Sequence, residues 1–296
     1  MALSRPSVAR NEPWSVDKPW KTERVLEELW SKHSRSTITV VSWRGKRLAM
    51  NKKELTTALA SELDMLETIE VRDLPHLTCL MPPSTASEQL ALLDCLVYHV
   101  PATIDIQARS FNFNILASKD HVIPGFINPM GGTWIRCVSG RATLSSVPNG
   151  TLTPADWAAL GAPPDPTDWA SLRENTMILP LVAGSQMMDP AGQPSVMALY
   201  FDEATYLEGG IYWDRMHILP TLRWLNKTYG HPAARLFGPS PGEVLAVLVQ
   251  LQREVNKFPA RFTQHCSKED LLAELQNAMR KMSALVQASR SNGAWR

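Results

Sequence analysis

The sequence lacks the features that mark membrane, secreted and cysteine-rich proteins. No apolar run reaches the roughly 20 residues that a bilayer-spanning helix needs. Residues 1–12 contain no apolar segment typical of a secretory signal. Only four cysteines occur, and none forms a Cys-x-x-Cys pair, so neither a disulfide framework nor a cysteine zinc site is indicated. We therefore expect a cytoplasmic or nuclear protein with no membrane partner.

An excess of charge of one sign is also absent. Lys plus Arg is 30 and Asp plus Glu is 29, which gives a formal net charge of +1. This balance gives no specific nucleic-acid signal. What the sequence does have is 44% hydrophobic residues and ten tryptophans among its 296 residues. These proportions are typical of a folded protein with an aromatic-rich core or an aromatic-lined pocket.

Local patterns predict helices and strands in the first quarter of the chain. Residues 1–22 are polar and contain three prolines, so we expect an irregular arm. Residues 22–32 have the spacing of a short amphipathic helix, and the alternating, β-branched segments 37–43 and 68–74 predict strands. Asn51 with Glu54 three residues later predicts a helix start.

The middle of the chain is predicted to be β-rich and its end helical. Two strand-like segments flank Ser139-Gly140, which predicts a hairpin at that turn. Further strands are expected within 176–182, 196–201 and 205–213. After residue 217 the pattern turns helical, and Ser240 with Glu243 predicts the start of a helix.

This order of elements predicts an α+β protein. The expected architecture is a double-stranded β-helix, a jelly-roll or cupin-like barrel, wrapped by N- and C-terminal helices. We divide the chain into an N-terminal arm (1–22), a barrel domain with a helical N-terminal part (23–235) and C-terminal helices (236–296).

One segment resembles a known family. Residues 126–141 read FINPMGGTWIRCVSGR and are similar to the first metal-ligand strands of the JmjC-like (Jumonji-C) group of Fe(II)/2-oxoglutarate dioxygenases. Weaker likeness continues in 181–187 and 208–214. The resemblance covers roughly residues 68–225 and is strongest to compact fungal JmjC-like proteins. It implies a cupin-type barrel and, where the ligands are kept, dioxygenase chemistry with Fe(II) and 2-oxoglutarate.

The residues that carry this chemistry in the family are replaced here. Two His and one carboxylate must hold the iron. By the resemblance, the first His falls on Phe126, the carboxylate on Asn128, and the distal His on Met187 or Ser195. The lysine that holds 2-oxoglutarate falls on Ala142. These side chains form no iron triad, so we predict no cofactor and no metal.

Relocated iron ligands remain an alternative. None of the seven histidines is followed two residues later by Asp or Glu. Asp120 and His121 could form a substitute site, in which case Fe(II) and 2-oxoglutarate would bind. However, side chains of adjacent residues on a strand diverge.

A pocket without metal is a further alternative. The side chains that would line it are expected on the strands of the predicted barrel. Besides Ala142 and Ser195, the candidates are Thr133, Trp134, Arg136, Asp202 and Tyr212. Such a cavity would accept an apolar small molecule, because one fold can host several functions.

Three functional hypotheses follow. The first is a pseudoenzyme, a non-catalytic binding or scaffold protein whose partner is a small apolar ligand or another protein. The second is a metal-independent enzyme, and the third is a dioxygenase with relocated ligands. Whether the chain is an enzyme stays open. The resemblance also implies a possible homodimer through the C-terminal helices.

Overall fold

In the computed structural model, the chain combines antiparallel β-sheets with five α-helices among the residues that are described. The predicted α+β class is therefore confirmed. The structure describes residues 7–10, 20–32, 37–42, 46–61, 68–72, 112–127, 132–148, 176–189, 195–213, 217–229 and 240–291.

The larger sheet has eight strands, and all of its pairings are antiparallel. In spatial order its strands are β1 (Ser7–Arg10), β10 (Ser185–Asp189), β7 (Gly132–Ser139), β12 (Thr205–Tyr212), β5 (Asn112–Ala117), β4 (Ile69–Arg72), β2 (Ile38–Ser42) and β3 (Arg47–Met50). Strand β1 lies within the segment predicted as an irregular arm. Residues 7–10 are extended there because they pair with β10.

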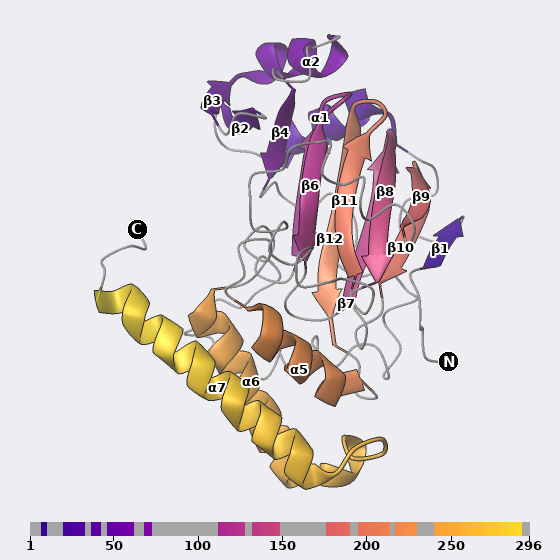
Figure 1. Ribbon diagram of the computed structural model, residues 1–296. Helices are drawn as coiled ribbons and strands as arrows, with labels where there is room; N and C mark the ends of the chain where they lie inside the picture. Colours follow the sequence, from indigo (N-terminus) through magenta and orange to yellow (C-terminus); the bar gives the residue numbers. More distant parts are fainter. Residues whose placement is uncertain are drawn as a thin grey trace.

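The smaller sheet has four strands and faces the larger one (Figure 1). In spatial order its strands are β6 (Val122–Ile127), β11 (Ser195–Phe201), β8 (Arg141–Pro148) and β9 (Met177–Val182). In the described residues the strands thus form two separate sheets and not the closed barrel that the sequence suggested.

Consecutive strands cross from one sheet to the other at tight turns. Strand β7 pairs with β10 and β12, whereas β8 pairs with β11 and β9. The predicted hairpin at Ser139-Gly140 is therefore wrong, although the turn itself is present. Gly140 has φ +80°, and a Cβ there would collide with the carbonyl oxygen of Ala204. The turn signal is local, but the pairing is decided by burial between the two sheets.

The two ends of the sheet pair differ. At one end, called the turn end, the strands are joined by residues 118–121, 140, 183–184 and 202–204. Backbone hydrogen bonds close this end, among them Ala183 N to Gly140 O at 3.0 Å and Asp120 N to Phe201 O at 2.8 Å. At the opposite end, called the loop end, lie the last residues of β6, β8 and β10 (Ile127, Pro148 and Asp189) and the first residues of β7, β9 and β11 (Gly132, Met177 and Ser195).

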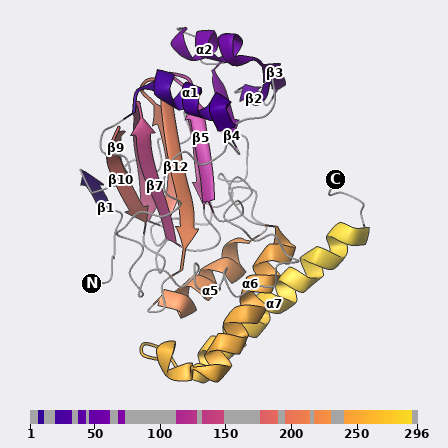
Figure 2. The same ribbon diagram turned by 180° about the vertical axis from the view of Figure 1, so that it is seen from behind.

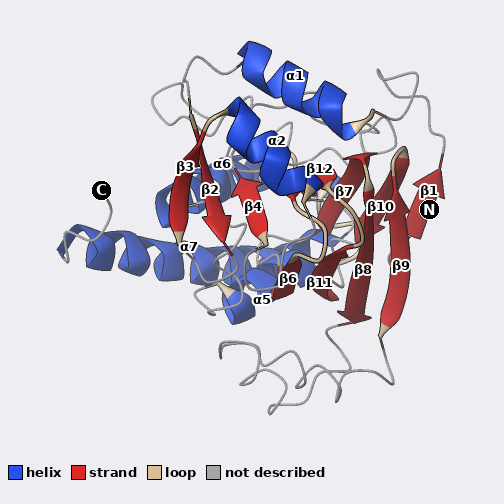
Figure 3. Ribbon diagram, turned by 90° about the horizontal axis from the view of Figure 1, so that it is seen from above, coloured by secondary structure: helices blue, strands red, loops and turns tan. Residues whose placement is uncertain are grey.

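Three separate apolar clusters stabilise the fold. The inner core lies between the two sheets and consists of Ile115, Ala117, Ile123, Ile135, Cys137, Ala142, Leu144, Leu181, Met187, Met197, Leu199, Phe201 and Leu207. A second cluster joins α1 (Thr22–Lys32) and α2 (Lys52–Ala60) to the outer face of the larger sheet. Figure 2 shows α1 crossing this face, and Figure 3 shows both helices from above.

The predicted helix starts are confirmed. Asn51 and Glu54 form a capping box at the start of α2, and Ser240 and Glu243 do the same for α6 (Pro241–Lys257). These reciprocal bonds satisfy backbone N–H groups that would otherwise lack partners in the first turn.

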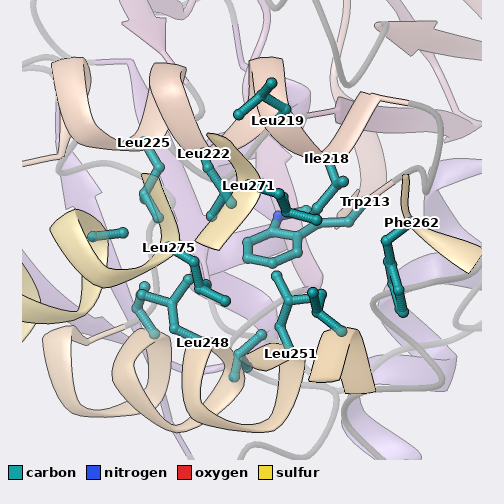
Figure 4. Packing of buried hydrophobic residues seen from close by; sticks show 14 of the residues in the cluster. Trp213, Ile218, Leu219, Leu222, Leu225, Leu248, Leu251, Phe262, Leu271 and Leu275 are labelled. Atoms are coloured by element: carbon teal, nitrogen blue, oxygen red, sulfur yellow. The ribbon is translucent and has the colours of Figure 1, made fainter. Parts of the chain in front are cut away.

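The third cluster belongs to the C-terminal helices α5 (Ile218–Thr228), α6 and α7 (Lys268–Ser291), with a short 3-10 turn (Pro259–Arg261) between α6 and α7. Trp213, which directly follows β12, lies fully buried among their leucines (Figure 4). No helix in the described part of the chain has the length and apolar character needed to cross a membrane.

Candidate functional site

The inner faces of the two sheets are apolar except near the loop end. Side chains alternate between the two faces of a strand. Four inner-core residues, one on each of four strands, are Ile135, Met187, Met197 and Leu144. On each of these strands, the residue two positions nearer the loop end lies on the same face. Those residues are polar, and they are Thr133, Asp189, Ser195 and Ser146. All four are buried, with exposed fractions of 1% or less. We call these four residues the polar ring.

Methionine residues lie next to the polar ring on their strands. Across the larger sheet, Met187 pairs with Ile135, and Ile135 pairs with Gly209. In the smaller sheet, Ser146 lies between Met197 and Met177. Methionine side chains are unbranched and flexible, so they adapt to irregular spaces.

Gly209 leaves room for an aromatic ring at the same level. Its strand partner is Phe113 on β5, and a Cβ at Gly209 would collide with the Phe113 ring and lie 2.7 Å from the carbonyl oxygen of Trp134. Phe113 is half-buried and packs against the inner core. The wall beside the polar ring is therefore formed by methionine and phenylalanine side chains.

Asp189 is the only member of the polar ring that can carry charge. Its Oδ2 accepts a hydrogen bond from the backbone N–H of Ser195 at 2.9 Å, and its Oδ1 accepts one from the Ser195 hydroxyl at 2.8 Å. Burial raises the pKa of Asp189 to about 7, and the two bonds from Ser195 oppose this rise. Desolvation disfavours the charged carboxylate, whereas donors favour it. Asp189 can therefore gain or lose a proton near neutral pH.

The other ring members adjoin Asp189 and Ser195 through strand pairing. Thr133 on β7 is the direct cross-strand partner of Asp189. Ser195 on β11 pairs with Pro148 on β8, which places Ser146 diagonally from Ser195, a separation of about 7–8 Å. The buried Ser146 hydroxyl has no hydrogen-bond partner. The polar ring thus joins both sheets.

The positions carried over from the JmjC-like resemblance lie on different strands. Phe126 is on β6 and pairs with Met197 on β11, while Asn128 lies outside the described residues. Met187 is on β10, in the other sheet, and pairs with Ile135. Ser195 begins β11, the strand next to β6.

These positions do not suit iron and 2-oxoglutarate. Ala142 belongs to the inner core and has no polar group for a carboxylate. Met187 is fully buried in the same core, and a thioether suits Fe(II) poorly. In the described parts of the chain, no three His, Cys, Asp or Glu side chains gather closely enough to hold a metal ion.

Two predicted pocket residues face away from the inner core. Trp134 and Arg136 alternate with Ile135 and Cys137, so they lie on the outer face of the larger sheet. Both are fully or almost fully buried there, and the Arg136 guanidinium carbon lies 5.7 Å from the Trp134 ring centroid.

The remaining pocket candidates are spread over both ends of the sheets. Asp202 lies at the turn end, where Oδ2 accepts a hydrogen bond from the Thr143 hydroxyl at 2.9 Å and lies 3.6 Å from Arg141 Nε. Tyr212 ends β12 at the loop end. Of these candidates, the structure brings Thr133 and Ser195 together with Asp189.

The alternative pair Asp120 and His121 is split between two environments. His121 is buried, with Nδ1 at 3.1 Å from Thr68 Oγ1 and Nε2 at 3.4 Å from Glu70 Oε2. Asp120 has φ +62°, and its carboxylate accepts a hydrogen bond from the exposed Tyr200 hydroxyl. The two side chains therefore do not point to a common centre. Their location at the turn end also separates them from the polar ring.

Sequence reasoning missed Asp189 and Ser146. Residues 181–187 were noted only for a weak likeness to the family, whereas 185–189 form β10 and bring Asp189 to the inner face. A usable signal was the alternation of Ser185, Met187 and Asp189 after Gly184, which is a glycine with positive φ. Ser146 lies at the expected spacing from Ala142 and Leu144 on a strand that was predicted.

Comparison with known proteins gives a distant relative of this chain. No family model matches the chain. The sequence is 25% identical over 227 residues to KK-1 biosynthesis cluster protein D of Curvularia clavata, an alignment that covers 70% of this chain and 22% of that protein. The chain thus spans about a fifth of the length of this relative.

Proposed function

We propose that this chain is a JmjC-like double-stranded β-helix protein that lacks the iron triad and acts as a non-catalytic binding or scaffold protein. The observation that carries this proposal is the inner face itself. At the positions that the resemblance gives to the distal iron ligand and to the lysine that holds 2-oxoglutarate, the chain has Met187 and Ala142, and both belong to the apolar inner core.

The strand order supports the double-stranded β-helix. Strands β10, β7, β12 and β5 form the part of the larger sheet that faces β6, β11, β8 and β9. From β5 to β8 successive strands alternate between the sheets, and after β9 the alternation continues through β12. Two four-stranded faces connected in this way are typical of jelly-roll architectures.

The similarity to the Curvularia protein suggests a setting for the binding function. The name of that protein assigns it to a biosynthesis cluster. We propose a biosynthetic role for this chain as well, in which it holds an apolar small molecule or a protein partner. A cytoplasmic location is consistent with this role.

A metal-independent enzyme is the second candidate function, and Asp189 favours it. A carboxyl group with a pKa of about 7 can serve as a general acid or base at neutral pH. In this case Asp189 would exchange the proton, and Thr133 and Ser195 would orient the substrate.

The iron content of the purified protein tests the main proposal. The full chain is expressed in medium supplemented with Fe(II), purified without chelators, and its metal content is measured by mass spectrometry. The same protein is incubated with 2-oxoglutarate, Fe(II) and ascorbate, and succinate is measured. We expect far less than one iron per chain and no succinate above the level without protein.

A variant at His121 separates relocated ligands from the proposed loss of iron. One iron per chain together with succinate formation would refute the proposal. If His121→Ala then lost both, the dioxygenase with relocated ligands would be the correct alternative. His265→Ala, which changes an exposed histidine between the C-terminal helices, is the matched control.

A further inference from the structure

We propose that strand β3, at the edge of the larger sheet, binds an extended acidic segment of a partner protein by β-strand addition. This inference rests on the proposed binding function and deepens it, because it names the surface and the chemical class of the protein partner.

Strand β3 ends the larger sheet on one side (Figures 1 and 3). Among the described residues it pairs with β2 alone. Leu48 and Met50 are half-buried and pack against the second apolar cluster, below α1 and α2. Arg47 and Ala49 alternate with them and are exposed. The strand is therefore anchored by one face and open on the other.

The hydrogen-bond pattern of the β2–β3 ladder leaves one edge of β3 for a partner. The backbone N–H of Ser42 donates to the carbonyl oxygen of Lys46 at 2.9 Å. In an antiparallel ladder, such hydrogen-bonded pairs alternate with pairs that are not hydrogen-bonded. The even-numbered residues of β3 therefore bond to β2, whereas the N–H and C=O groups of Arg47 and Ala49 point away from it. These outward groups can bond to an added strand.

Proline interrupts two other edge strands but not β3. Strands β6 and β9 end the smaller sheet, and they contain Pro124 and Pro180. Proline has no backbone N–H, and its presence in an edge strand hinders the addition of a further strand. Strand β3 contains no proline, so both of its outward N–H groups can donate to a partner.

Four exposed cations surround the edge of β3. Lys46 directly precedes the strand, Arg47 begins it, and Lys52 and Lys53 begin helix α2 just after it. None of the four forms a salt bridge with a residue that the structure describes. The nearest carboxylate in the sequence, Glu54, accepts a hydrogen bond in the capping box of α2. The edge is therefore electropositive.

This charge favours an acidic partner over a second copy of the chain. Two copies that met along β3 would bring the same cations together, and like charges on paired strands disfavour pairing. An acidic strand would bring opposite charges to the edge. If its acidic and apolar residues alternate, the carboxylates lie on the open face beside Arg47, and the apolar side chains extend the face of Leu48 and Met50.

Three matched peptides test the inference. Acetyl-Glu-Val-Glu-Val-Glu-Val-amide has the expected pattern, and its analogue with Lys in place of Glu has the opposite charge. The fully N-methylated acidic peptide keeps its carboxylates but has no N–H groups along its backbone. Each is titrated into the full chain and followed by calorimetry. We expect the acidic peptide to bind at least about tenfold more tightly than the other two, and less tightly at high salt.

Hydrogen exchange followed by mass spectrometry locates the bound peptide. The outward amide groups of Arg47 and Ala49 should become protected when the acidic peptide adds to β3. Residues 177–182, which form the edge strand β9, are the internal control and should exchange at an unchanged rate.

Variants connect the binding to the edge. Ala49→Pro removes an outward N–H but no hydrogen bond to β2, so it should fold and bind the acidic peptide at least about tenfold more weakly. Ala49→Val keeps the N–H and should bind normally. Arg47→Glu should weaken binding several-fold, whereas Arg280→Glu, at an exposed position on α7, should not. Circular dichroism checks folding, and Arg47→Glu still tests the inference if Ala49→Pro does not fold.

Several outcomes would overturn the inference. These are equal binding of the acidic and lysine peptides, undiminished binding of the N-methylated peptide, no binding at millimolar concentration, or unchanged binding in folded Ala49→Pro. Tighter binding of an oligothymidylate than of the acidic peptide would also overturn it, in favour of a nucleic-acid surface. Such results leave the proposed function intact if the protein lacks iron. Iron and succinate formation would refute the proposed function whatever the peptides do, so the two failures are distinguishable.

Discussion

At the scale of single residues, burial controls the proton affinity of groups in the sheets. Asp189 is fully enclosed, and its pKa rises from 3.8 to about 7. Tyr206 on the outer face of the larger sheet is also buried and donates a hydrogen bond to Glu208 at 3.0 Å. Desolvation, together with the nearby Glu208 carboxylate, raises the pKa of Tyr206. Asp189 differs because its change of charge occurs near neutral pH.

Asp189 should make the stability of the protein depend on pH. Between its ordinary pKa of 3.8 and its folded value of about 7, the folded state binds more protons than the unfolded state. The free energy of unfolding should therefore decrease as pH rises from about 4 to about 7 and then level off, by about 1.4 kcal/mol for each unit of pKa difference. Urea unfolding at several pH values measures this decrease.

The variant Asp189→Asn is the control for this pH dependence. Asparagine does not titrate, and its carbonyl oxygen can still accept a hydrogen bond from Ser195. The contribution from Asp189 should be missing from the pH profile of the variant. Parallel profiles of the two proteins would contradict the assignment.

Sequence patterns located several inner-face residues but not the charged one. Met187, Ser195 and Ala142 were candidates by resemblance and Thr133 was a candidate pocket residue, and all four share the inner face. The alternation of side chains along a strand accounts for this shared face. The same alternation puts Arg136 on the outer face of the larger sheet. Asp189 was missed because the pairing partner of its short strand lies far away in the sequence.

At the scale of elements, local sequence signals predicted the helix starts and most strands. They did not predict which strands pair with each other. The capping boxes of α2 and α6 depend on residues three positions apart and are readable from sequence. The pairing of β7 with β12 joins residues 132–139 to 206–212 and depends on burial of both sheets. The hairpin prediction failed for this reason.

The same Gly-to-Ala change in two elements should have opposite effects. In Gly209→Ala on β12, the new methyl would collide with Phe113 and with the carbonyl oxygen of Trp134, which should cost about 2 kcal/mol of stability. In Gly242→Ala on α6, no atom lies within 4 Å of the new Cβ. The higher helix propensity of alanine should then add up to about 1 kcal/mol.

Thermal and urea unfolding of the two variants measure this contrast. The double variant Phe113→Leu/Gly209→Ala should recover part of the loss, because the smaller side chain leaves room for the methyl group. A Gly209→Ala protein as stable as the original would show that the Phe113 ring does not pack against Gly209.

At the scale of the whole molecule, the fold consists of a sheet pair, with α1 and α2 on the outer face of the larger sheet and the C-terminal helices packed around Trp213, which follows β12. The C-terminal cluster and the inner core share no residue, and Ile211 and Trp213 connect them along the chain. The apolar face of α7, including Leu271, Leu275 and Met282, packs within this cluster. A homodimer through the C-terminal helices would therefore use another face of α7.

Separate cores predict that stability can be lost in one part of the molecule. Leu248→Ala in α6 and Leu144→Ala in β8 each remove a fully buried side chain, at a cost of about 2–5 kcal/mol. Hydrogen exchange followed by mass spectrometry should show lost protection mainly in α5–α7 for the first variant and mainly in β5–β12 for the second. A uniform loss across the chain in both variants would show a single cooperative unit.

The crossing of consecutive strands between the sheets also has a kinetic consequence. Strand β5 pairs with β12, and β6 with β11, so the central ladders join segments that are far apart in the sequence. The entropy of closing such long loops must be lost before the pairings form, which makes folding slow compared with that of helical proteins. Until β11 and β12 have been synthesised, β6 lacks its partner β11, and β5 can pair on one side only, with β4. The early strands of a nascent chain therefore depend on the last third of the polypeptide for protection against aggregation.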